Sequence, residues 1–104
     1  MPTFDDREKA FENKYAHDQE MQFRAEARRN KLMGLWVADL LGKSGEAAAD
    51  YAKAVVKADF EEAGHEDVMR KVLGDLDGRV SEAEVRAKYE ELLTVAKGQL
   101  LNED

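Results

Sequence analysis

The stretch LMGLWVADLLGKSGEAAADYAKAVVKADF, residues 32–60, decides the fold class of this chain of 104 residues. Its first third is almost wholly apolar, and GKSG at 42–45 then interrupts it. A glycine suits the left-handed position that ends a helix, and Ser44 can cap the helix that follows. After the interruption, apolar residues recur at the spacing of a helix face, at Ala48, Tyr51, Ala52 and Val55. The stretch therefore predicts two helices joined by a tight turn.

Two more helices are predicted downstream. One covers about 65–77, where apolar residues again recur at helical spacing. The other starts at Ser81, because Ser81 and Glu84 stand at the spacing of a capping box. Val80 and Val85 flank this start at the positions of a hydrophobic staple.

Upstream, one continuous helix is predicted from about Thr3 to Leu41, since the one proline of the chain is at position 2. No segment shows the pattern of a strand. The sequence thus predicts an all-α protein, with an antiparallel four-helix bundle over residues 21–104 and a mobile, conditionally helical N-terminal arm over residues 1–20. The predicted core consists of Leu32, Trp36, Leu40, Tyr51, Val55, Met69, Val72, Leu76, Tyr89, Leu92 and Ala96.

Composition argues against several classes of function. The net charge of −7 argues against a nucleic-acid binder and against binding to an anionic membrane. Because the chain has no cysteine, disulfide scaffolds, zinc–thiolate sites and thiol catalysis are excluded. The longest apolar stretch, residues 32–41, is too short to cross a membrane and contains Asp39.

Catalysis and metal binding find no support either. His17 and His65 have no serine or cysteine nucleophile near them in the sequence, and no motif singles out a pair of carboxylates. The acidic turn DFEEAGHED at 59–67 lacks the pattern of a calcium-binding loop, and acids at the start of a helix are its simpler interpretation. We therefore expect no enzyme, no metal site and no cofactor.

The first twenty residues differ from the rest. Phe4, Phe11 and Tyr15 lie within about 20° of one line on a helix of 100° per residue, with mostly charged or polar residues between them. From Met21 onward the apolar face of the same run is centred about 80° away. On a continuous helix these two faces cannot both meet one core. Two interpretations stay open: a recognition helix whose aromatic side chains enter a partner's groove, or a segment that packs on the surface of its own bundle.

A basic segment, RAEARRNK at 24–31, is a second candidate site. Arg24, Arg28 and Lys31 share one helix face, and Arg29 points elsewhere. Guanidinium groups suit phosphate oxygens, so this face can be interpreted as a nucleotide or phosphate site, although no glycine-rich phosphate loop accompanies it. The alternative is a solvent-exposed face, or one that pairs with the acidic turn.

Two long runs resemble the zeta-type inhibitor subunit of alphaproteobacterial F-type ATP synthases. They are TFDDREKAFENKYAHDQEMQFRAEARRNKLMGLWVADLLGKSG at 3–45 and YAKAVVKADFEEAGHEDVMRKVLGDL at 51–76. The elements FDDRE, AHD, EARRNK and LWVADLLGK carry most of the resemblance, and the last helix adds little. Relatives often have proline in the acidic turn, where this chain has Ala63.

The resemblance implies a small four-helix protein with a mobile N-terminal arm, here about residues 2–19. Such an arm inserts as a helix into a catalytic interface between the alpha and beta subunits of the F1 head and reaches the gamma subunit. It stops ATP hydrolysis by blocking rotation. The implied location is the bacterial cytoplasm, at the cytoplasmic face of the inner membrane.

Residues and resemblance together give the expected sites. The expected partner-binding residues are the anchors Phe4, Phe11 and Tyr15, with Arg7, Glu8, Lys9 and Lys14 as polar contacts around them. The runner-up function is a regulator that binds phosphate or nucleotide, with weak binding of ATP or ADP, through Arg24, Arg28 and Lys31. A monomer is expected, because a bundle that closes its own core leaves no long heptad seam for dimerisation.

Overall fold

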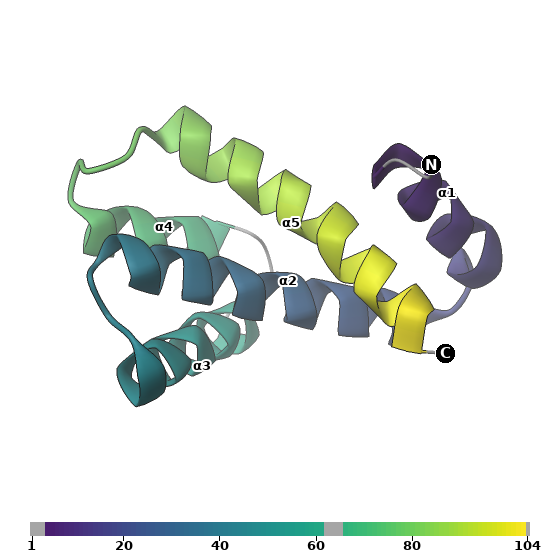
Figure 1. The fold of residues 1–104 in the computed structure, drawn as a ribbon, viewed down its shortest axis with the longest axis horizontal. Coiled ribbons are helices and arrows are strands. Elements are labelled where there is room, and N and C mark those ends of the chain that lie inside the picture. Colours follow the sequence, from purple (N-terminus) through teal and green to yellow (C-terminus); the bar gives the residue numbers. More distant parts are fainter. Residues whose placement is uncertain (1–3, 62–65, 104) are drawn as a thin grey trace.

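The computed structural model describes residues 4–61 and 66–103, and the side chains of residues 6–58 and 66–103 among them. These residues form five helices and no strand: α1 (Phe4–Tyr15), α2 (Gln19–Leu40), α3 (Gly45–Glu61), α4 (Glu66–Leu76) and α5 (Glu82–Glu103). Figure 1 shows α2 as the central element, with α3 on one side of it and α5 crossing on the other. The predicted all-α class is confirmed.

The prediction of one continuous helix from Thr3 to Leu41 is wrong, because the chain breaks between α1 and α2. Asp18 caps α2: its Oδ1 accepts a hydrogen bond from the backbone N–H of Met21 at 3.1 Å. The N–H of Asp18 also donates to the carbonyl of Tyr15 at 2.9 Å, which closes the last turn of α1. A short acid at the N-cap position satisfies an N–H that has no helical partner, so the sequence AHD can end one helix and start the next.

The predicted end of α2 and the predicted start of α5 agree with the structure. The α2 helix finishes with Gly42 at φ +78°, and the N–H of Lys43 donates to the carbonyl of Ala38 at 2.9 Å. This is the Schellman arrangement that glycine favours. At the start of α5, the N–H of Glu84 donates to Ser81 Oγ at 3.2 Å, as the capping box predicts.

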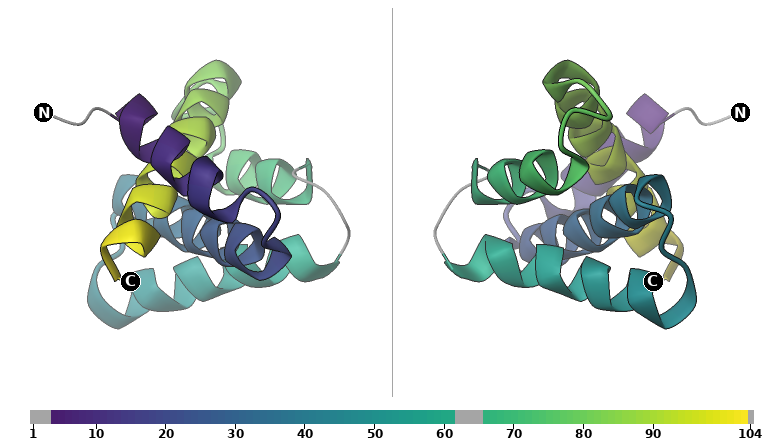
Figure 2. Two further views of the ribbon diagram at one scale, coloured as in Figure 1. Left: turned by 90° about the vertical axis from the view of Figure 1, so that its right-hand side faces the viewer. Right: turned by 90° about the vertical axis from the view of Figure 1, so that its left-hand side faces the viewer.

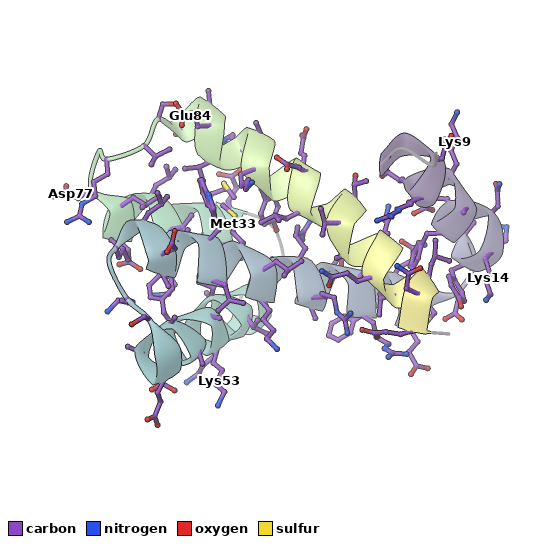
Figure 3. All side chains as sticks on the ribbon, viewed as in Figure 1. Lys9, Lys14, Met33, Lys53, Asp77 and Glu84 are labelled. Carbon is purple, nitrogen blue, oxygen red and sulfur yellow. The ribbon has the colours of Figure 1, made fainter. Side chains whose placement is uncertain are left out.

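The main core lies among α2, α3, α4 and α5. Met33 projects from α2 into it (Figure 3). Its fully or nearly fully buried members are Met33, Val37, Val55, Val68, Met69, Val72, Leu76, Val85 and Tyr89. The predicted core is largely found here, but its α2 stripe is displaced by one residue. Leu40 is 37% exposed, and the predicted core omitted Met33 and Val37, which α2 buries in full.

A smaller second cluster joins α1 to the rest of the molecule. It consists of Phe11, Met21, Ala25 and Leu100, with Tyr15, Leu93 and Leu101 packed against it. The expectation that the segment before residue 20 and the helix after it cannot share a core is therefore wrong in this structure. The break at Asp18 turns α1 back, so that both apolar faces meet at α5.

A polar contact links α3 to α4. Tyr51 Oη donates to Asp75 Oδ2 at 2.7 Å, and Lys71 Nζ lies 3.1 Å from the same oxygen. Burial acts to raise the pKa of Asp75, but the hydrogen bonds from Tyr51 and Lys71 and the lysine charge outweigh it and hold that pKa below its ordinary value. Burial and the bond to Asp75 raise the pKa of Tyr51, so the phenol remains the donor at neutral pH.

We expect the charge on Asp75 to stabilise the fold at neutral pH and to lose this effect in acid. A carboxyl with a lowered pKa in the folded state stabilises fully above its unfolded pKa, about 3.9, and the effect disappears as pH falls through the folded pKa. Urea unfolding of the chain and of Asp75→Asn should therefore differ by a constant free energy from about pH 5 to 8. The difference should shrink below about pH 4, and an equal difference at pH 3 and pH 7 would contradict this account.

Among the described residues, no helix is long and apolar enough to cross a membrane.

Candidate functional site

The helix α1 lies across the C-terminal half of α5 (Figure 2). Phe11 is the centre of this contact: its side chain is 0% exposed and packs with Met21 and Leu100. Tyr15, one turn further along α1, is half-buried, and its ring centre lies 5.0 Å from that of Phe11. The aromatic face predicted for partner binding is thus turned, from Phe11 to Tyr15, onto the protein's own surface.

A buried lysine on α5 faces two acids on α1. The side chain of Lys97 is only 8% exposed, and its Nζ lies 2.7 Å from Glu12 Oε1 and 3.3 Å from Glu8 Oε1. Glu8 and Glu12 are four residues apart, so they stand on one face of the helix. Thr94 Oγ1 donates to the other oxygen of Glu8 at 3.2 Å. A charge this deeply buried needs compensating charges, so the two glutamates offset the cost of burying the Lys97 ammonium group.

A glycine allows the two helices to approach closely. A Cβ atom placed on Gly98 of α5 would lie 3.1 Å from Cδ and 3.7 Å from Cβ of Arg7 on α1. The side chain of Arg7 therefore passes directly over the bare backbone of Gly98. A larger residue at this position would require the side chain of Arg7 to move aside.

The connection between α1 and α2 is three residues long, and a side chain of α2 bonds back to the end of α1. Gln22 Nε2 donates to the carbonyl of Tyr15 at 3.1 Å and lies 3.4 Å from Glu12 Oε2. His17, in the connection, is exposed. Beside it, a shallow hollow of about 340 Å³ is lined by residues that include His17, Gln22 and Phe23.

The other predicted partner-binding residues divide between two faces of α1. Lys9 and Lys14 project away from the body of the molecule (Figure 3). Glu8, predicted as an outer polar contact, instead bonds to Thr94 and Lys97. The side chain of Phe4 lies outside the described residues.

Sequence reasoning missed the α5 half of this contact. Lys97 and Gly98 stand between Ala96 and Leu100, which are both buried. A lysine beside a glycine within the apolar stripe of a helix is the signal that was available. It indicates a close helix approach with an acid on the opposing side.

Of the three basic residues predicted as a phosphate site, Arg24 and Arg28 both act on Glu103 of α5, and Lys31 lies apart from them. Arg28 pairs with Glu103 through its two Nη atoms, and the hydrogen bond from Arg28 holds the pKa of Glu103 below its usual value. Lys31 lies elsewhere, at the rim of a mostly apolar groove of about 480 Å³ that Lys53 and Lys57 also line. Arg24 is exposed. Phosphate or nucleotide binding by Arg24, Arg28 and Lys31 stays a prediction.

Arg29 points away from this face, as predicted, and is buried. Its guanidinium carbon lies 3.9 Å from the ring centre of Tyr89, which places a cation over an aromatic face of the core. Its role is in packing α2 against α5. In the part of the chain that the structure describes, no three acidic or histidine side chains are grouped as a metal site. His65, in the acidic turn, lies outside the described residues, as does Ala63.

Comparison with known proteins identifies the family. The family model described as ATPase inhibitor subunit zeta matches residues 1–99. A protein solved by solution NMR is 77% identical in sequence, with a TM-score of 0.76 over 81% of this chain and 99% of that chain. Comparison with curated proteins gave no match. The chain belongs to the ATPase inhibitor subunit zeta family.

Proposed function

We propose that this protein inhibits ATP hydrolysis by an F-type ATP synthase, and that α1 is the inhibitory element. In this proposal α1 inserts as a helix at a catalytic interface between the alpha and beta subunits of F1 and reaches the gamma subunit. It performs no chemistry itself, in keeping with a family of inhibitor subunits and not of enzymes. It stabilises one closed state of the partner and so stops the rotary cycle.

One observation supports the proposal: α1 is a separate helix that packs outside the main core. Among the residues whose side chains the structure describes, none of α1 belongs to the main core, and the connection to α2 is three residues long. Most contacts of α1 are with α5, and few are with α2. An element fastened in this way can be presented to a partner without unfolding its scaffold.

The residues of α1 then have distinct roles. Phe11 and Tyr15, with Phe4, are the apolar anchors at helical spacing that helix-in-groove recognition requires. Lys9 and Lys14, which are exposed in the free protein, would meet polar groups at the rim of the partner's groove. Arg7 and Glu8 complete this set. The proposed location is the bacterial cytoplasm, on F1 at the inner membrane, and the proposed state in solution is a monomer.

Replacing Phe11 by alanine tests the proposal. We expect Phe11→Ala to raise the concentration needed for half-inhibition of F1 ATP hydrolysis at least tenfold, about 1.4 kcal/mol, because a central aromatic anchor is lost. The matched control is Phe23→Ala on α2, where the phenylalanine is 50% exposed and lies outside the proposed inhibitory helix. We expect Phe23→Ala to change inhibition less than about twofold. Equal inhibition by Phe11→Ala and the unmodified chain would refute the role of α1 as the anchor helix.

A further inference from the structure

We propose that the contact between α1 and α5 is an autoinhibitory latch: the chain inhibits only after α1 has left α5. This inference rests on the proposed function and adds a regulation to it. The latch consists of Glu8, Phe11 and Glu12 on α1 and of Lys97 and Gly98 on α5.

The first step is that the same apolar face of α1 packs on α5 in the closed protein and, in the proposed function, binds F1. Phe11 is 0% exposed in the closed protein. A side chain that is buried against Met21 and Leu100 cannot be buried in a partner's groove at the same time. Docking on α5 and docking on F1 therefore exclude each other.

The second step is that the closed state is fastened by specific contacts and not by apolar packing alone. Lys97 bonds to both Glu8 and Glu12, and its Nζ lies 5.8 Å from the ring centre of Phe11. Arg7 lies against Gly98. Glu8 and Glu12 lie near Phe11 on α1, and the single buried Lys97 forms ion pairs with both acids. These contacts fit only one register of α1 on α5.

The third step is that the connection permits opening. Residues Ala16, His17 and Asp18 include neither proline nor glycine, and the sequence on both sides favours a helix. Two hydrogen bonds span the connection, and both end on the carbonyl of Tyr15: one comes from the N–H of Asp18 and one from Gln22 Nε2. A closed fraction of this kind lowers the apparent affinity for the partner in proportion to the open fraction.

An engineered disulfide tests the latch directly, because the chain has no cysteine of its own. A Cβ at position 98 would lie 3.7 Å from Cβ of Arg7, within the range of about 3.5–4.5 Å that disulfides adopt. The variant carries Arg7→Cys and Gly98→Cys, and inhibition of F1 ATP hydrolysis is measured for its oxidised and reduced forms. We expect the oxidised form to need at least about tenfold more protein for half-inhibition than the reduced form. Single variants Arg7→Cys and Gly98→Cys, treated in the same way, should show no dependence on oxidation.

The reverse change should open the latch. Lys97→Glu places a third carboxylate beside Glu8 and Glu12, and we expect it to inhibit at a several-fold lower concentration than the unmodified chain. Lys88→Glu, the same charge change elsewhere on α5, is the control and should have no such effect. Circular dichroism of both variants checks that they keep their helices.

Each outcome decides between the two proposals. Equal inhibition by the oxidised and reduced double variant would overturn the latch and leave the inhibitory function standing. Absence of inhibition by the unmodified chain would overturn both. Failure of the two cysteines to join under oxidising conditions would contradict the closed state itself.

Discussion

Gly34→Ala is expected to lower the free energy of unfolding by about 2–3 kcal/mol, although alanine is the better helix former. A Cβ atom at position 34 would lie 2.6 Å from Cα of Ala52 and 3.3 Å from Cβ of Val55. The nearest atom belongs to the backbone of α3, so it cannot move aside without separating the two helices. Because α2 and α3 form the most extensive helix pair of the fold, this separation opens the main core.

The matched control is Gly74→Ala on α4, where a Cβ atom would meet nothing within 4 Å. There the gain in helix propensity acts alone, and we expect the free energy of unfolding to rise by up to about 1 kcal/mol. Urea unfolding monitored by circular dichroism measures both changes. If Gly34→Ala were as stable as Gly74→Ala, the close crossing of α2 and α3 would be refuted.

Local rules of capping predicted most of the fold from the sequence. Ser81 with Glu84, and the run GKSG at 42–45, mark helix ends through side chains and backbone within four residues of each other. Such signals act at short range and need no knowledge of the tertiary structure. The same reasoning missed Asp18, because an acid within a charged segment does not stand out as a cap.

Tertiary contacts decided what the sequence left open. The buried stripe of α2 passes through Met33 and Val37 and not through Leu32, Trp36 and Leu40. Both stripes have helical spacing, and the close approach of Gly34 to Ala52 is one tertiary contact that favours the buried stripe. Periodicity gives the existence of an apolar face but fixes its centre no better than about one residue.

In the candidate site, too, local sequence predicted one part and tertiary contacts set the other. Phe11 and Tyr15 were predicted to belong to the apolar face of the N-terminal arm, and they do form one. Of the two interpretations of that face, packing on the protein's own surface is found here. The position of Lys97, about ninety residues away in the chain, could not be connected with Glu8 from the sequence alone, because an i to i+4 pattern reports only neighbours on one helix.

Removing residues 2–17 is expected to abolish inhibition, which is the largest functional effect we predict. The truncated chain has Asp18 directly after Met1 and therefore keeps the residue that caps α2. It retains all members of the main core, so α2 to α5 should remain folded. It lacks Phe11 and both carboxylates that bond to Lys97.

The truncated chain should also melt at a lower temperature. Met21 and Leu100 lose the side chain that covers them, and Lys97 loses both its acids. For a domain of this size, each 1 kcal/mol of lost stability lowers the melting temperature by about 4–8 °C. An unchanged melting temperature would show that α1 contributes nothing to the scaffold, in conflict with the buried position of Phe11.

The rate of ATP hydrolysis by F1, measured against increasing amounts of the full and the truncated chain, tests most directly whether α1 is the inhibitory element. The full chain should slow hydrolysis to a low plateau. The truncated chain, folded by circular dichroism, should leave the rate unchanged at concentrations about a hundredfold higher, which corresponds to a loss of at least about 2.7 kcal/mol in binding. A folded truncated chain that inhibits as strongly as the full chain would contradict the account.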